Sequence, residues 1–479
     1  MSLPPAKNVA SPEYEMSSAR ALRVLLIIIV LVLTFEGVVR KMQIPGTSVP
    51  IFLLKDVIVL IMAFHVMRMT LPRSIDFLWG AYLGLIALFV PVILVTALHD
   101  PVLALFGAKE YLLYPFVGLA VFYAYHDVGM DEIVRFFRWT SLLIIPTFIV
   151  AMIQLRLPPG HWLNLSVEGD MLDNFAAAGK LRVSSTFSFV AQYGAFLNAE
   201  FFMLIIALHQ TRDLNFFWKA VYIGLIPLFV ISNYVTGSRG AVDGCTAVIA
   251  IAGGLSLVKL QLRSVFRLLG IIVGLVIVVL AGQYFLPDEF AAYSERERGQ
   301  LIGISSNVQQ RIFDALFNWT GSIFSQPLFG NGLGVMSNGS NTFSDYASHE
   351  RLVAGWTETD FATTLFEGGF YLILVWYGFR FYIIYQTLRR FLADVDERFS
   401  LPASFCQANV ILLGLTATLG MQPPLAIWWW MAVGTSLLLW WKCVEPKRDE
   451  TGLPIDQPAQ TAKKPRGRSA YAERLHRGR

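Results

Sequence analysis

Long apolar stretches recur along this 479-residue chain, and they constrain its fold more than any other feature. A helix needs about 20 consecutive apolar residues to cross a bilayer. Runs of roughly that length lie at 21–39, 49–67, 78–98, 110–126, 138–155, 190–208, 218–236, 241–258, 265–286, 361–386, 405–421 and 424–443. Because lipid offers no partner to unpaired backbone groups, these runs predict an all-α polytopic membrane protein of about twelve transmembrane helices.

Composition supports the same class and argues against a metal centre. Hydrophobic residues make up 55% of the chain and charged residues 15%, a balance that a single soluble core would not require. Cys245, Cys406 and Cys443 lie in or beside apolar runs and have neither CxxC nor Cys/His spacing. The sequence therefore indicates no disulfide framework and no zinc site. We expect no metal and no other cofactor.

The distribution of Lys and Arg sets the expected topology. Basic connections alternate with connections poorer in Lys and Arg, and the positive-inside rule then places both termini in the cytoplasm. Residues 1–20 form a cytoplasmic segment, 21–443 the transmembrane domain, and 444–479 a basic tail, disordered and either close to anionic lipid or merely solvated. The long loops 156–189 and 287–360, the second between the ninth and tenth spans, fall outside. That side is the periplasm if the chain lies in a bacterial inner membrane.

Ionisable residues gather at the outer ends of these spans. They are Glu36, Arg40, Lys55, Asp56, Lys109, Glu110, Arg156, Arg239, Glu358 and Asp360. Single pairs have a simpler explanation, because Glu36 and Arg40 are i and i+4 on one helix and can neutralise each other. A bundle that only spanned the membrane would not collect charge at one depth. Together these residues indicate a polar cavity open to the outer face.

Arg239 is the main candidate for binding an anion. It stands in Thr236-Gly-Ser-Arg-Gly240, a connection short enough to be a tight turn, and its permanently charged fork matches phosphate oxygens. The alternative is an arginine that snorkels to lipid head groups. Arg182 and Arg311 are further outer cations, and Arg311 lies on an amphipathic stretch at 309–324.

The start of the tenth span carries the candidate acids and bases. Asp360, Thr364 and Glu367 are i, i+4 and i+7, which keeps one helix face polar for two turns. Asp360 can equally be a helix cap, and Glu367 can bond a neighbouring helix. His349 is the only histidine of the long outer loop and a further candidate base. The glycines of 329–334 shape a turn, since no strand precedes them as a nucleotide motif requires.

In their order along the chain, these motifs resemble the O-antigen ligase and polymerase superfamily. The resemblance rests on Thr236-Gly-Ser-Arg-Gly-Ala241, the long outer loop with its Arg-bearing helix, Pro327-Leu-Phe-Gly-Asn-Gly-Leu-Gly334 and Glu367-Gly-Gly-Phe370, with an echo in Phe35-Glu-Gly-Val-Val-Arg-Lys41. Membership implies a GT-C-like helical bundle that transfers a glycan from a polyprenyl diphosphate to an acceptor hydroxyl without metal. It also implies that Arg239 and Arg311 bind the diphosphate.

The chain departs from the ligases of that superfamily at one position. They usually carry His-Asn where this chain has Glu358-Thr359. Either a carboxylate or an imidazole can accept a proton, so Glu358 becomes the expected general base. The expected function is polymerisation of lipid-linked repeat units, with inversion at the anomeric carbon. Glycan ligation to lipid A-core is the alternative within the superfamily, and a secondary transporter with the same number of spans is the alternative outside it.

The remaining expectations concern substrate contacts and partners. The residues expected to bind substrate are Arg40, Lys109, Arg182, Arg311, Trp356, Asp360 and Glu367. Trp356 offers a flat face to a sugar ring, although Trp is common at a membrane interface in any case. The expected partners are the polyprenyl-diphosphate-linked glycan, membrane lipid and a chain-length regulator, with no nucleic acid.

Overall fold

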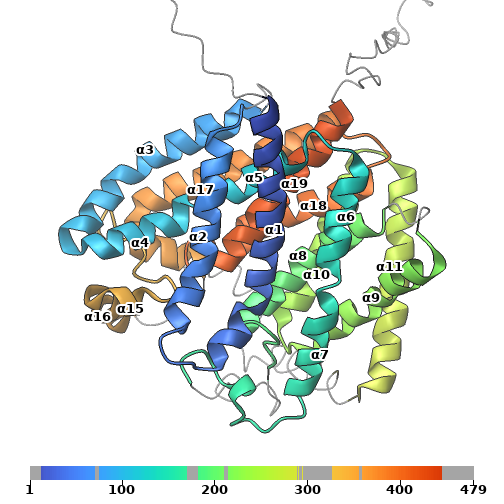
Figure 1. Ribbon diagram of the computed structural model, residues 1–479, viewed down its shortest axis with the longest axis horizontal. Helices are drawn as coiled ribbons and strands as arrows, with labels where there is room; N and C mark the ends of the chain where they lie inside the picture. The colour runs from blue at the N-terminus through green and yellow to red at the C-terminus, as the bar shows by residue number, and fades with distance from the viewer. Residues whose placement is uncertain are drawn as a thin grey trace, which may run out of the picture.

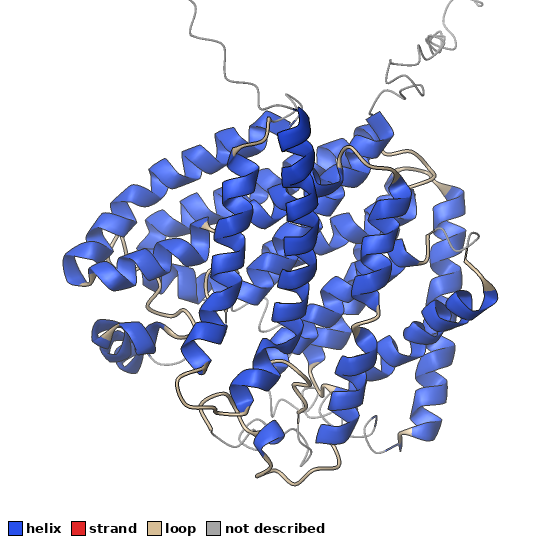
Figure 2. Cartoon of the chain, in the orientation of Figure 1, coloured by secondary structure: helices blue, strands red, loops and turns tan. Residues whose placement is uncertain are grey.

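A computed structural model describes residues 12–70, 75–169, 182–209, 214–287, 326–354 and 359–444, together with Phe290 and Ser294. The described part of the chain is a helical bundle that contains no strand (Figures 1 and 2). This confirms the expected all-α class.

The helices follow the apolar runs of the sequence. They are α1 (Pro12–Lys41), α2 (Ser48–Met67), α3 (Asp76–His99), α4 (Pro101–Leu112), α5 (Pro115–Tyr125), α6 (Met130–Ser141), α7 (Ile144–Gln154), η2 (Trp162–Asn164), α8 (Val190–Ala207), α9 (Phe216–Val235), α10 (Arg239–Val258), α11 (Leu262–Phe285), α15 (Ser340–Phe343), α16 (Asp345–Ala354), α17 (Asp360–Asp394), α18 (Ser400–Thr416) and α19 (Pro423–Val444).

Ten segments of the described chain are long and apolar enough to cross a membrane. They correspond to the first ten expected runs, with α4 and α5 forming one segment and α6 and α7 another. The last two runs form α18 and α19, and their crossing of the membrane stays a prediction. The chain is therefore a multi-pass membrane protein by length and composition of its helices.

One end of the bundle, which we call the terminal face, holds the start of α1 and the end of α19 (top of Figure 1). The side chain of Arg23, in the first half of α1, donates to the carbonyl of Ala124 at the end of α5 over 2.7 Å. Lys442, near the end of α19, donates to the carbonyl of His126 just beyond α5. These two bonds tie the end of α5 to α1 and to the end of α19 near this face.

The opposite end of the bundle, which we call the loop face, gathers the connecting segments. The N–H of Val38, near the end of α1, donates to the carbonyl of Thr186 over 2.8 Å. Lys41 donates to the carbonyl of Leu163, which lies in the segment after α7, over 3.3 Å. Two parts of the connection between α7 and α8, at Leu163 and at Thr186, therefore close around the end of α1.

The centre of the bundle is built on close contact between α5 and α19. A Cβ placed on Gly434 would lie 2.3 Å from the carbonyl oxygen of Gly118, so the two backbones touch directly, as small residues allow between membrane helices. Trp430 of α19, which is buried, lies beside this contact, with 3.1 Å between a Cβ at Gly118 and its ring. Helix α11 lies at the periphery (right edge of Figure 1), and only 11% of its most apolar stretch is buried.

The chain reverses inside α17, at Gly369. This residue has φ 64° and ψ −165°, a region open to glycine and to few other residues. The Tyr377 hydroxyl donates to Asp360 over 2.8 Å, whereas a straight helix would separate the two residues by about 25 Å. The expected single span at 361–386 is therefore wrong at its start. Residues 360–368 form a short limb that folds back against 370–394.

Glycines let the loop before α15 pack against this reversal by backbone contact. Gly330, Gly332 and Gly334 all have positive φ, as expected for turn residues. A Cβ on Gly330 would lie 2.4 Å from the backbone of Glu367. A Cβ on Gly334 would lie 2.6 Å from Gly107 Cα on α4. The loop is thus fixed between α4 and the short limb of α17.

Asp100 fastens the junction between α15 and α16 to the corner between α3 and α4. Its carboxylate caps α4 by accepting from the N–H groups of Val102 and Leu103, and it also accepts from the Ser344 hydroxyl. Burial alone would raise the pKa of Asp100, but these three donors together hold the pKa below its usual range. The Asp100 carboxylate therefore accepts these hydrogen bonds at neutral pH, and their stabilising contribution is lost only as pH falls through that lowered pKa.

We expect Gly369→Ala to destabilise the protein strongly. An added Cβ would meet the Pro327 carbonyl oxygen at 2.2 Å and would hold a strained backbone conformation that by itself costs about 1–3 kcal/mol. Gly378→Ala is the matched control, because nothing lies within 4 Å of a Cβ at that helical position. Thermal unfolding of the two purified variants is the measurement. Equal midpoints would show that the reversal does not require glycine.

Candidate functional site

A buried ion network lies between α1, α2 and α4. It consists of Glu36, Lys55, Asp56, Lys109 and Glu110. Lys55 Nζ lies 3.2 Å from Glu36 Oε2. Lys109 Nζ lies 2.7 Å from Asp56 Oδ2 and 2.9 Å from Glu110 Oε1. Charges inside a membrane bundle are retained when they pair with one another, and they mark functional sites by default.

The partners in this network differ from those that sequence spacing suggested. Glu36 pairs with Lys55 of the neighbouring helix, whereas Arg40 donates to Ser48 over 3.3 Å and to Ser188 over 3.5 Å. The i, i+4 alternative for Glu36 and Arg40 is therefore not the pairing that forms. The antiparallel packing of α1 against α2 puts Lys55 opposite Glu36, and sequence spacing does not contain that information.

The ring of Phe52 is the meeting point of three cations. The charged groups of Arg40, Lys55 and Lys109 lie 5.1, 4.0 and 5.5 Å from its centroid. Each distance is within the range of a cation–π contact. A Cβ on Gly339 would lie 3.4 Å from the same ring. The loop before α15 therefore covers Phe52 and the cations around it.

Glu367 connects the short limb of α17 to α4 and to the covering loop. Its Oε2 accepts from the Tyr111 hydroxyl over 2.7 Å, and its Oε1 accepts from the N–H of Met336 over 2.8 Å. The side chain is fully buried. The alternative weighed from sequence, a bond to a neighbouring helix, is what the structure contains.

Asp360 is buried in an ion pair that the sequence analysis missed. Arg380 donates to its carboxylate and also to the carbonyl of Gly414 on α18. The cap of α17 is Thr359, whose hydroxyl accepts from the N–H of Ala362. The alternative in which Asp360 caps the helix is therefore wrong. The sequence did contain a sign of this pair, because Arg380 is a cation inside an otherwise apolar span and needs an anionic partner there.

A second group of cations, the cationic rim, lies on the loop face around residues 182–188. It consists of Arg40, Lys41, Arg182 and Arg239. Arg40 contacts Ser188, and Lys41 donates to Ser184 over 2.5 Å. Gly237 lies against Arg182, with 3.4 Å between a Cβ at Gly237 and Arg182 Cγ. Arg239 follows two residues later, 7% exposed. The rim therefore combines residues from three distant parts of the chain.

The turn before Arg239 has the expected form. Helix α9 ends at Val235 and α10 begins at Arg239. Gly237 has φ 58°, and Ser238 makes no side-chain capping bond. A cation in the first turn opposes the helix dipole. The arrangement therefore favours an anion at this helix end, where backbone N–H groups and the arginine would face it together.

Three of the expected site residues lie outside the described part of the chain, and a fourth is described but is not part of these groups. Arg311, Trp356 and Glu358 lie outside the described residues. His349 is on α16, where its side chain is 74% exposed and its Nδ1 lies 3.5 Å from Glu350. In the described ranges, no three His, Cys, Asp or Glu side chains come together in a way that could hold a metal ion.

We expect Glu36→Gln to lower stability far more than Glu132→Gln. Removing the Glu36 charge leaves Lys55 buried without its carboxylate, a change worth about 3–5 kcal/mol. Glu132 forms an exposed pair with Arg135 at 2.9 Å, worth about 0–1 kcal/mol. Thermal unfolding of the detergent-purified variants compares the two. Similar shifts would mean that the Glu36–Lys55 pair is hydrated rather than buried.

Comparison with family models, with curated proteins and with solved structures finds no match to this chain. Residue chemistry and the geometry described above are therefore the only basis for a functional conclusion.

Proposed function

We propose that the protein is a membrane glycosyltransferase that polymerises lipid-linked polysaccharide repeat units. It would transfer glycan from a polyprenyl diphosphate to an acceptor sugar hydroxyl. The cationic rim is the observation that carries this proposal. Arg40 and Lys41 bond to Ser188 and Ser184 of the serine-rich segment 182–188, and Arg182 of that segment lies against Gly237, two residues before Arg239. Clustered cations at a membrane interface suit a polyanionic lipid head group.

The diphosphate is assigned to the start of α10. There the Arg239 guanidinium can bind two phosphate oxygens at once, and the helix dipole favours the same negative charge. Arg182, beside Gly237, would reach the second phosphate, and Arg311 from the long outer loop would add a third cation. Charge builds on the diphosphate as it leaves, so these groups would stabilise the transition state more than the ground state.

The acceptor hydroxyl would be deprotonated by Glu358, which directly precedes the Thr359 cap of α17. The hydroxyl oxygen attacks the anomeric carbon, the bond to the diphosphate breaks, and the proton passes to the carboxylate. The configuration at that carbon inverts. Asp360 and Glu367 already accept hydrogen bonds from protein donors, which supports a role in holding the short limb of α17 in place.

The terminal face lies in the cytoplasm in this proposal, and the loop face in the periplasm of a bacterial inner membrane. The positive-inside rule supports this orientation. The cations near the terminal ends of the described helices are Arg20, Arg23, Arg68, Arg135, Arg138, Lys219, Lys259, Arg263, Arg267, Arg389, Arg390, Arg398 and Lys442. Donor and acceptor would then meet on the side where surface polysaccharide is assembled.

A secondary transporter is the second candidate, and the buried ion network favours it. Ionisable groups inside the membrane often lie on ion pathways. Purified protein in liposomes with lipid-linked repeat units separates the two functions. A glycosyltransferase lengthens glycan with no ion gradient across the membrane. Gradient-driven uptake without lengthening would support transport, and transfer of one glycan to lipid A-core would support ligation.

We expect Arg239→Ala to abolish glycan lengthening and Arg239→Lys to restore only a small part of it. Lysine keeps the charge but loses the two-pronged contact with phosphate. Arg135→Ala is the matched control, because Arg135 is exposed and paired with Glu132 at the terminal face. Product length in membranes with equal amounts of each variant is the readout. Normal ladders from Arg239→Ala would remove this residue from the site.

We expect Glu358→Gln to lower the transfer rate by about 10²–10⁴-fold, the usual worth of a general base. At a pH above the imidazole pKa of roughly 6.5, Glu358→His should keep more activity than Glu358→Gln. His349→Ala should be mild, because the His349 side chain is 74% exposed. Rates are compared at saturating donor. If His349→Ala abolishes transfer while Glu358→Gln does not, the base is His349.

A further inference from the structure

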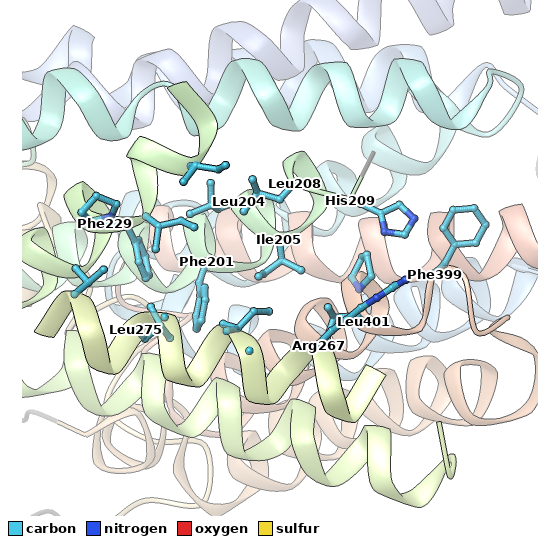
Figure 3. A pocket seen from close by; sticks show the side chains of 18 of the residues that line it. Phe201, Leu204, Ile205, Leu208, His209, Phe229, Arg267, Leu275, Phe399 and Leu401 are labelled. Carbon is cyan, nitrogen blue, oxygen red and sulfur yellow. The ribbon is translucent and has the colours of Figure 1, made fainter. Parts of the chain in front are cut away.

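An apolar groove opens between α8, α9, α11 and α18 (Figure 3). Its volume is about 990 Å³, at the upper end of the range for ligand pockets. Phe201, Leu204 and Ile205 of α8 and Phe229 of α9 form one wall, and Leu275 of α11 lies opposite them. The groove has the lining of a site for a hydrocarbon chain.

The groove is as long as a lipid chain requires. It shares Phe201, Phe229 and Leu275 with a second apolar cavity of about 410 Å³, which reaches Leu280. Between Arg267 and Leu280 the axis of α11 rises about 20 Å. One leaflet of the hydrocarbon core is about 15 Å thick, half of about 30 Å. The two cavities together therefore extend beyond a single leaflet.

Two glycines of α11 leave room in this groove. Gly270 and Gly274 line it, and no atom lies within 4 Å of a Cβ built at either position. Helices that pack through Gly-xxx-Gly usually bring their backbones into contact. Here the two glycines face open space, so something other than a helix of the described chain fills it.

One end of the groove is cationic. His209, Arg267 and Phe399 meet there at the terminal face (Figure 3). Arg398 is also at this end, but its Nε is bonded to Asp396 over 2.8 Å. No carboxylate of the described chain lies within 4.0 Å of Arg267. The charge of Arg267 therefore remains available to a ligand.

His209 adds no charge of its own at neutral pH. Burial lowers its pKa, and the nearby Arg267 lowers it further. Its ring lies 5.5 Å from that of Phe399, centroid to centroid, which leaves an uncharged aromatic wall beside the guanidinium. Among the described residues, the polar end of the groove thus presents one cation with no carboxylate partner, matched to one anionic group.

We propose that this groove binds an anionic glycerophospholipid from the leaflet at the terminal face. Its phosphate would pair with the Arg267 guanidinium, whose fork fits two phosphate oxygens. Its acyl chains would lie along α8, α9 and α11 and cover Gly270 and Gly274. A zwitterionic head group would bring its own cation towards Arg267 and Arg398, so an anionic lipid fits better. The site is separate from the cationic rim and does not depend on glycosyl transfer.

The test uses delipidated full-length protein titrated with phosphatidylglycerol, with bound lipid counted by native mass spectrometry. Arg267→Ala should weaken binding about tenfold, the worth of one hydrogen bond to a charged group. Arg263→Ala is the matched control, one helical turn earlier and facing Glu397 at 3.8 Å, and it should bind as the wild type does. Phosphatidylcholine should bind the wild type more weakly than phosphatidylglycerol does. Its affinity should be the same for the wild type, Arg267→Ala and Arg263→Ala.

A second variant tests the acyl-chain part of the site. Gly274→Leu fills the groove while Arg267 stays in place, and it should abolish lipid binding. Gly254→Leu on α10 is the control, because nothing lies within 4 Å of a Cβ there either and Gly254 does not line the groove. If Arg267→Ala does not yield folded protein, the comparison of Gly274→Leu with Gly254→Leu tests the proposal.

Four results would overturn the proposal. Arg267→Ala could bind phosphatidylglycerol as tightly as the wild type, or Gly274→Leu could leave binding unchanged. Glycerol 3-phosphate alone could compete at the affinity of the whole lipid, which would make this a site for a free anion. Wild-type protein could form a dimer that Gly274→Leu disrupts, which would make the groove an interface with a second copy.

Discussion

Charge buried in an apolar bundle must find a partner, and that constraint holds the half of this protein nearer the loop face together. Each buried pair joins two helical segments: Glu36 of α1 with Lys55 of α2, Asp56 of α2 with Lys109 of α4, and Asp360 of the short limb of α17 with Arg380 of its long limb. Breaking a pair leaves an uncompensated ion where water cannot reach it. The pairs therefore allow few alternative registers of α1, α2, α4 and α17, and they place the polar groups of the candidate site.

Backbone contact between glycines completes this arrangement. Gly334 touches Gly107, and Gly330 touches the backbone at Glu367. Side chains at these positions would hold the covering loop away from the ion network and let water in. A site closed in this way strengthens the interaction of its fixed charges with charge that develops during a reaction. Packing and electrostatics at the loop face therefore depend on the same few residues.

The sequence alone was enough to predict the helices and the turn at Arg239, because run length and glycine position are local properties. It did not reveal that Glu36 pairs with Lys55 or that Asp360 pairs with Arg380, since those choices depend on which helices become neighbours. The apolar run 361–386 continues through Gly369, so a hydropathy pattern could not show the reversal. The groove beside Arg267 is formed by four helices and has no local pattern of its own.

Because the chain reverses at Gly369, the length of the short limb of α17 sets the position of the first residue of that helix. About 14 Å of helix separates its first residue from the turn, and Asp360 is held at the level of Arg380 and the end of α18. Every residue added to this limb would move its start by about 1.5 Å and rotate it by about 100°. The number of residues between Thr359 and Gly369 therefore fixes both the depth and the direction at which the chain enters the bundle.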